Sequence, residues 1–196
     1  MLDEAKDARE AVAATIRIIA VLAVGASPLL ASRADAEIAG FASNGFEVRE
    51  QVHVSAGSKA VYAALTTPKR WWASDHTYSR DATRLTLDPR AGGCWCERLP
   101  DGGSVQHLTV VYAAPEKALR LRGALGPLQA MGVAGSLTIS LKEAGEGTDV
   151  TLTYAVGGYA HEGFETLAKT VDGVLSEQLA RLKRLLETGS PESAKP

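Results

Sequence analysis

The stretch GFETLAKTVDGVLSEQLARLKRLL, residues 163–186, decides the fold. Its apolar residues recur every three or four positions, which places them on one side of a helix of about six turns. Gly189 and Pro191 follow, and both residue types are typical just beyond the C-terminus of a helix. The apolar positions are Phe164, Leu167, Ala168, Val171, Val174, Leu175, Leu182, Leu185 and Leu186. A helix with such a face needs a second layer to cover it.

The residues before this helix predict that layer. Residues 46–54 alternate apolar and polar side chains, which is typical of a strand with one buried face. We expect two short helices next, over residues 55–65 and from Pro68 onward. The turn Pro100–Gly103 predicts a hairpin between two of the later strands. Further strands are predicted at 84–88, 93–99, 104–112, 119–125, 136–143 and 148–156.

This order of elements predicts an α+β helix-grip fold. Clean alternation in each strand indicates an antiparallel sheet with one buried face. A curved sheet of about six to seven strands cannot bury its concave face alone, so the long C-terminal helix should lie across it. This arrangement leaves a cavity between helix and sheet, closed at one end by the two short helices.

The N-terminal residues predict a secretory signal peptide. Residues 18–26, IIAVLAVGA, form a short apolar run after Arg17 and before the small-x-small site Ala34-Asp35-Ala36. The run is too short to span a bilayer, which takes about 20 apolar residues. The acidic residues before Arg17 fit this interpretation poorly, and a later start codon or an uncleaved anchor are the alternatives. These acidic residues are Asp3, Glu4, Asp7 and Glu10.

The predicted organisation follows from these segments. We expect a cleaved signal peptide at 1–36, a linker at 37–45, the ligand-binding domain at 46–187 and a disordered tail at 188–196. The mature protein would be periplasmic or secreted, without stable membrane insertion once the signal is removed.

Composition excludes several classes of function. The formal net charge is -2, and the sequence contains no basic cluster of the kind that binds nucleic acid. Phosphate-loop, dinucleotide and Gly-x-Ser-x-Gly motifs are also missing from the sequence. We therefore expect neither a cofactor nor a metal, and a small hydrophobic molecule as the partner.

Three motifs resemble the SRPBCC (START-like) superfamily. They are TTPKRWW at 66–72, DPRAGGCWCE at 88–97 and APEKAL at 114–119. The resemblance covers residues 45–187 and is closest to the branch named after the activator of the heat-shock chaperone ATPase, with the polyketide cyclases nearby. The segment GALGPLQ at 123–129 is similar to a secreted subgroup. The resemblance implies the helix-grip fold, whereas function in this superfamily ranges over binders, carriers, cyclases and regulators.

Candidate site residues come from the expected hairpin register. With Leu99 opposite Ser104, Cys96 faces His107, and Glu97 faces Gln106 on the apolar, cavity side. There burial would raise the pKa of Glu97 and make it a candidate acid or base. The alternative is a carboxylate at the rim, paired with Arg120 or Arg122. The predicted ligand-binding residues are Trp71, Trp72, Trp95, Glu97, Gln106, Leu108, Tyr112, Leu121, Met131, Ile139, Tyr154, Val171 and Leu175.

Two further features have more than one interpretation. His76 lies in a loop at the expected cavity mouth, where Asp75 would orient it, and is the second catalytic candidate. Cys94 and Cys96 would point to one face of a strand with Cα atoms roughly 6.5–7 Å apart, at the edge of disulfide geometry. Two free thiols are therefore expected, with a labile disulfide or a weak metal site as alternatives.

These observations support three hypotheses. The first is an exported protein that binds a small hydrophobic ligand in the cavity. The second is a cyclase or isomerase that uses Glu97 as acid and base, with Gln106 or Tyr112 orienting a carbonyl. The third is a module for protein interaction or regulation.

Overall fold

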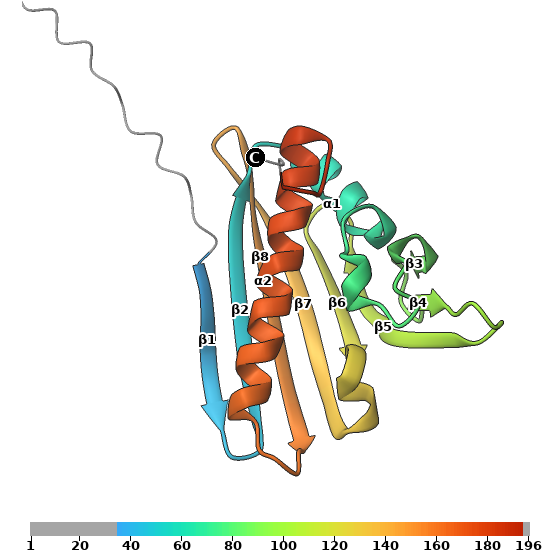
Figure 1. Cartoon of the computed structure of the whole chain (residues 1–196). Coiled ribbons are helices and arrows are strands. Elements are labelled where there is room, and N and C mark those ends of the chain that lie inside the picture. The colour runs from blue at the N-terminus through green and yellow to red at the C-terminus, as the bar shows by residue number, and fades with distance from the viewer. Residues whose placement is uncertain (1–34, 194–196) are drawn as a thin grey trace, which may run out of the picture. The chain divides into compact units, whose positions relative to one another are not determined.

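One antiparallel sheet of eight strands and a long C-terminal helix organise residues 35–193, the part of the chain that the computed structural model describes (Figure 1). The strand order is β1-β2-β8-β7-β6-β5-β4-β3. The elements are β1 Asp35–Ala42, β2 Gly45–Val54, α1 Ser58–Leu65, η1 Pro68–Arg70, η2 Ser74–His76, η3 Ala82–Arg84, β3 Leu85–Leu87, β4 Cys94–Arg98, β5 Ser104–Ala114, β6 Ala118–Gly123, η4 Gly126–Ala130, β7 Gly132–Ala144, β8 Gly147–Tyr159 and α2 Glu165–Thr188. The α+β helix-grip fold is thereby confirmed, with one strand more than predicted.

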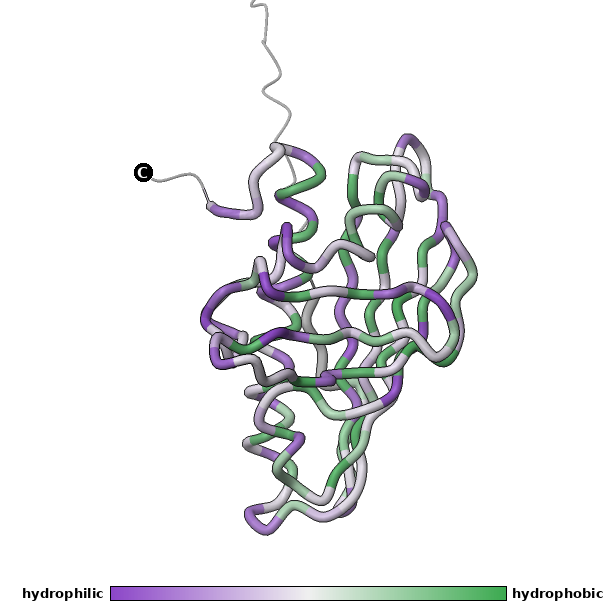
Figure 2. Tube along the Cα trace, turned by 90° about the vertical axis from the view of Figure 1, so that its right-hand side faces the viewer, coloured by the Kyte–Doolittle hydropathy of each residue, from purple (hydrophilic) through white to green (hydrophobic). Residues whose placement is uncertain are grey.

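The helix α2 covers the concave face of the sheet. It lies along β2 and contacts β1 as well (Figure 1). The alternation of hydrophobic and hydrophilic residues along the strands, visible in Figure 2, explains why one face is buried. Residues of the α2 stripe such as Ala168, Leu175 and Leu182 pack on that face. The expected two-layer architecture is the one that the chain adopts.

Short helical segments fill the connection between β2 and β3. The helix α1 and the 3-10 turn η1 are the two short helices expected, and the turns η2 and η3 follow. The Trp71 Nε1–H group donates to the Ala64 carbonyl at 3.0 Å, which fixes η1 against α1. Trp71, Trp72 and Trp95 pack edge to face, with ring centroids 5.1–6.3 Å apart. This aromatic group joins the short helices to β4.

Segment 37–45 was predicted as a linker and forms most of β1 instead. β1 pairs with β2 from Asp35 opposite Gln51 to Ala42 opposite Gly45, so backbone pairing adds it to the sheet edge. A cut after Ala36 would remove the first two residues of β1. The remainder of the predicted signal peptide, residues 1–34, lies outside the described residues. Among residues 35–193, no helix combines the length and the apolar character needed to cross a membrane.

The described part of the tail, Gly189 to Ser193, packs back on α2, which corrects the prediction of a disordered tail. Gly189 ends the helix in the left-handed conformation, with φ 80°. The Arg184 side chain then donates to the Pro191 carbonyl at 2.8 Å. Arg181 binds both carboxylate oxygens of Glu192. Residues 194–196 lie outside the described range.

Replacing Gly135 with Ala should lower the free energy of unfolding by about 1–3 kcal/mol, the usual cost of overpacking. A Cβ atom at Gly135 would lie 2.4 Å from Cε2 of Tyr154. That ring cannot move easily, because it is fully buried and its hydroxyl binds the Leu125 N–H and the Gly123 carbonyl. The measurement is the urea midpoint of the variant.

The control is Gly173→Ala in α2, where an added Cβ has nothing within 4 Å. This variant should gain about 1 kcal/mol, because Ala is the better helix former. Equal midpoints for the two variants would contradict the close packing of Gly135 on Tyr154.

Candidate functional site

Two bulges in β5 determine which of its side chains reach the interior. His107 has no partner between the pairs Cys96–Gln106 and Trp95–Leu108. Val111 is likewise extra, between the pairs Val110–Leu121 and Tyr112–Arg120. Each bulge shifts the inward-facing positions by one residue. The side chains of residues 107, 108 and 110 therefore face inward, and those of residues 111 and 112 both face outward.

The bulges overturn part of the predicted register. Ser104 lies opposite Arg98 rather than Leu99, and Cys96 faces Gln106 rather than His107. Gln106 is therefore on the outer surface, and so is Tyr112, whose ring lies 5.7 Å from the Arg120 guanidinium. Neither residue lines the cavity. The prediction of Gln106 and Tyr112 as ligand-orienting groups is wrong for this reason.

A cavity of about 340 Å³ lies where α2, the turn η2, strands β3 to β5 and the segment around η4 meet. Its walls are mainly apolar and aromatic, and a few polar groups project into it. Cavities of this size and character hold small ligands in other proteins. The lining residues are Trp72, Asp75, His76, Thr77, Tyr78, Leu85, Trp95, His107, Leu125, Gly126, Pro127, Leu128, Leu167, Thr170, Val171, Val174 and Leu175.

The structure brings five of the predicted site residues together in this cavity: Trp72, His76, Trp95, Val171 and Leu175. The other predicted apolar residues pack away from it, because the cavity lies toward β3 and β4 rather than at the centre of the sheet. Trp71, Leu108, Leu121, Ile139 and Tyr154 belong to the solid core. Met131 is 41% exposed. These six residues do not line the cavity.

Exposed polar contacts bridge the mouth of the cavity. His76 Nε2 lies 3.0 Å from Glu177 Oε2 on α2. The Tyr78 hydroxyl donates to the Gly126 carbonyl at 2.8 Å. The Trp72 Nε1–H group donates to the His76 carbonyl at 3.0 Å and so holds that loop in place. The predicted candidate His76 is thus a residue of the mouth, and its partner is Glu177 rather than Asp75.

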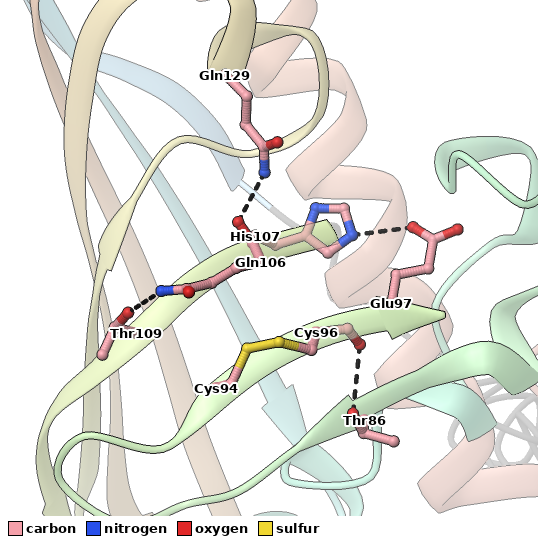
Figure 3. The surroundings of a disulfide bond; sticks show 8 residues. All are labelled: Thr86, Cys94, Cys96, Glu97, Gln106, His107, Thr109 and Gln129. Atoms are coloured by element: carbon pink, nitrogen blue, oxygen red, sulfur yellow. Dashed lines mark hydrogen bonds and ion pairs between the residues drawn. A yellow bond between two sulfur atoms is a disulfide. The ribbon is translucent and has the colours of Figure 1, made fainter. Parts of the chain in front are cut away.

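Glu97 and His107 form a buried pair at the cavity wall. His107 Nε2 lies 2.9 Å from Glu97 Oε2, as Figure 3 shows. Glu97 also accepts hydrogen bonds from the backbone N–H groups of Tyr78 and Ser79. Glu97 is fully buried and His107 is 6% exposed. Of the two, His107 lines the cavity, while Glu97 lies behind it.

The hydrogen bonds around Glu97 contradict the prediction that its pKa is raised. Burial alone would raise the pKa of Glu97, but the hydrogen bonds from Ser79, His107 and Tyr78 outweigh burial and hold the pKa below its usual range. Glu97 is therefore an ionised carboxylate at neutral pH. The arginine pairing considered as the alternative does not occur either, because the partner is His107.

Cys94 and Cys96 form a disulfide on the outer face of β4, which corrects the expectation of free thiols (Figure 3). Their Cα atoms are 5.4 Å apart, within the range that a disulfide spans. The expected 6.5–7 Å assumed a fully extended strand. Opposite the bulge at His107, β4 is less extended than a regular strand, so the two Cα atoms lie closer together.

A second pair of polar groups, in this case two carboxyl groups, joins the sheet to α2. Glu50 lies on the inner face of β2 between Val48 and Val52 and is fully buried. It faces Asp172 and Ser176 of α2. Within the described residues, neither Glu50 oxygen has a hydrogen-bond partner, and the same holds for Asp172 Oδ1. Burial, followed by the adjacent Asp172 carboxyl group, raises the pKa of Glu50 to about 8.

The fold and the cavity define a helix-grip protein with a ligand-sized apolar site. The sequence model of one family, described as polyketide cyclase/dehydrase and lipid transport, matches residues 45–187. The chain therefore belongs to this family, within the SRPBCC superfamily. The comparison with curated proteins found no match.

Solved structures share the fold at low sequence identity. A conserved protein of unknown function, EF2215 from Enterococcus faecalis, is 20% identical, with a TM-score of 0.57 over 83% of this chain and 82% of its own. MLL2253 from Mesorhizobium loti is 17% identical, with a TM-score of 0.53 over 72% of this chain and 96% of its own. CalU16 from Micromonospora echinospora is 16% identical, with a TM-score of 0.52 over 81% and 86%. At such identities these likenesses establish the fold alone.

Proposed function

We propose that this protein is exported and binds one small, mainly apolar molecule in the cavity between α2 and strands β3 to β5. The observation that carries the proposal is the cavity of about 340 Å³ with aromatic and aliphatic walls. Export is supported by the apolar run at 18–26 and the Ala34-Asp35-Ala36 site. The matched family, which includes lipid transport in its description, supports the binding function.

Binding is tested with Val174→Trp, which places a large ring in the cavity from a half-buried position on α2. We expect affinity for a fluorescent apolar probe, anilinonaphthalene sulfonate, to fall by about tenfold or more, because the ring occupies the space of the ligand. The control is Val111→Trp on the outer face of β5, where Val111 is 43% exposed. Equal probe affinity in both variants and the wild type would overturn the proposal.

Export and occupancy are tested together by native mass spectrometry of the protein from the envelope of its own host. We expect a small molecule that leaves the protein on denaturation. We also expect the mass of the protein itself to match a chain that begins at Glu37. A full-length mass would argue against a cleaved signal. An empty protein would count against tight binding.

The second candidate is a cyclase or isomerase, and the buried Glu97–His107 pair favours it. In this function His107 touches the ligand, and Glu97 acts through His107 rather than directly. Turnover would then be lost in His107→Gln while binding of the apolar probe persists.

A further inference from the structure

The disulfide in β4 lies directly opposite the first bulge in β5 (Figure 3). Cys94 pairs with Thr109 and Cys96 pairs with Gln106, so the disulfide closes the same stretch of β4 that faces the extra residue His107. The Cα atoms of the two cysteines are 5.4 Å apart, whereas a regular strand would separate them by roughly 6.5–7 Å. Because β4 is shortened here, β5 has more chain than β4 can pair, and the excess is the bulged residue.

The hairpin has a second register available, without the bulge. If β5 paired residue by residue beyond Leu108, Cys96 would face His107 and Glu97 would face Gln106. A slip of one residue exchanges inner and outer side chains, so Gln106 would replace His107 on the inner face. The amide of Gln106 can donate to the Glu97 carboxylate in place of the imidazole. Both registers therefore give Glu97 a polar partner.

Only the turn side of the hairpin has to move between the two registers. On the other side of the bulge, the Val110 N–H group donates to the Gly93 carbonyl at 2.8 Å and anchors the two strands together. At the turn, Ser104 now faces Arg98, and the mainly exposed loop 99–103 connects the strands. In the regular register Leu99 would join the ladder opposite Ser104, and the loop would shorten by that residue. The exposed loop can therefore absorb the slip.

We propose that the Cys94–Cys96 disulfide is a redox site, reduced by a dithiol, that holds the hairpin in its bulged register. Both cysteines are partly exposed on the outer face of β4, so a thiolate can reach their sulfur atoms. The first thiolate of the dithiol attacks one cysteine sulfur, the S–S bond breaks, and a mixed disulfide forms. The second thiolate then releases the protein sulfur. Both electrons and both protons come from the dithiol, which leaves as its own disulfide.

Reduction lets β4 extend and moves the hairpin into the regular register. His107 then leaves the cavity wall for the outer face, and Gln106 takes its place beside Glu97. The hydrogen bond from Gln129 Nε2 to the Gln106 carbonyl, 2.9 Å long in the bulged register, is lost (Figure 3). The redox state of the outer face thus decides which polar side chain lies at the inner face. This inference goes beyond the proposed binding function and does not depend on it.

The test compares the full chain with and without dithiothreitol, in the absence of denaturant. The chain has two cysteines and both are in this bond, so the reductant has one target. Iodoacetamide followed by mass spectrometry should find no alkylated cysteine before reduction and two afterwards. The interstrand nuclear Overhauser contacts should shift by one residue, from Cys96–Gln106 to Cys96–His107. A native protein that dithiothreitol does not reduce, or a reduced protein that keeps the Cys96–Gln106 contact, would overturn the inference.

A second readout is the reactivity of His107 with diethyl pyrocarbonate, mapped by peptide mass spectrometry. His107 is 6% exposed and should be protected in the oxidised protein. On reduction its reactivity should rise toward that of His53, whose side chain is 41% exposed on β2 and which serves as the internal reference. A His107 that stays protected after reduction would contradict the slip.

The matched variant carries Cys94→Ser and Cys96→Ser together. It should show the shifted contacts without any reductant and should not respond to dithiothreitol. The comparison of oxidised and reduced wild type stands even if this variant does not fold. Every measurement is made on ligand-free protein, so a cavity that fails to bind the apolar probe would count against the proposed function alone.

Discussion

Glu50→Gln is expected to make the protein more stable than the wild type in alkaline solution and to remove most of the pH dependence of its stability. Folding buries Glu50 beside Asp172 and raises its pKa from 4.5 to about 8. Below pH 4.5 the carboxyl group is protonated in both the folded and the unfolded chain, so nothing is lost. Between pH 4.5 and about pH 8 the carboxyl group is ionised only in the unfolded chain, so folding must take up a proton and stability falls as the pH rises. Above about pH 8 the group is ionised in both states, and stability falls no further on its account.

The wild type should therefore lose stability by about 1.4 kcal/mol per pH unit over that interval. Among the described side chains, β8 presents Leu152 opposite Glu50, and α2 presents Asp172 and Ser176. None of these groups carries a positive charge that could compensate.

The measurement is the urea midpoint of both proteins at pH 5, 7 and 9. Glu47→Gln is the matched control, because Glu47 occupies the same strand but the outward face. The control should keep the wild-type slope. A Glu50→Gln protein with that same slope would show that Glu50 is not the group that titrates.

Trp95→Ala is expected to cost about 3–5 kcal/mol of stability, the range for removal of a large buried aromatic side chain. Trp95 is 2% exposed, and its ring contacts Trp72 with centroids 5.1 Å apart. Its loss would remove one wall of the cavity and one third of the aromatic group that joins η1 to β4. Chemical denaturation measures the effect.

Tyr159→Ala serves as the control, since Tyr159 is 69% exposed and should change stability by about 0.5 kcal/mol at most. Indole added to Trp95→Ala should restore part of the lost stability, because a ligand that binds only the folded state stabilises it. A loss of stability below about 1 kcal/mol would contradict this prediction and would mean that the surrounding side chains close the space left by the indole ring.

Much of the fold could be predicted from the sequence, because strand alternation and the helical stripe are strong local patterns. The same patterns also place Glu50 on the buried face, between Val48 and Val52. Asp172 follows Ala168 by one helical turn, on the buried stripe of α2. This acidic pair was overlooked, although its sequence signal was present.

The Glu97–His107 pair could not be predicted from the sequence in the same way. Its formation depends on the bulge at His107, and a bulge is a property of two strands rather than of one. The adjacent buried residues His107 and Leu108 break strict alternation only once the pairing is known. β1 was not predicted for another reason. Its first two residues, Asp35 and Ala36, belong to the predicted signal-peptide cleavage site.

The bulges in β5 have a consequence for how this cavity could diverge among relatives. Between them, the inward-facing positions are even-numbered, and beyond His107 toward the turn they are odd-numbered. Losing or gaining a single codon in this strand would therefore exchange inner and outer side chains without any substitution. A polar residue of the cavity lining such as His107 could be acquired or discarded in one such step. Alignments of the family should accordingly treat one-residue gaps in this strand as changes of ligand chemistry rather than as neutral length variation.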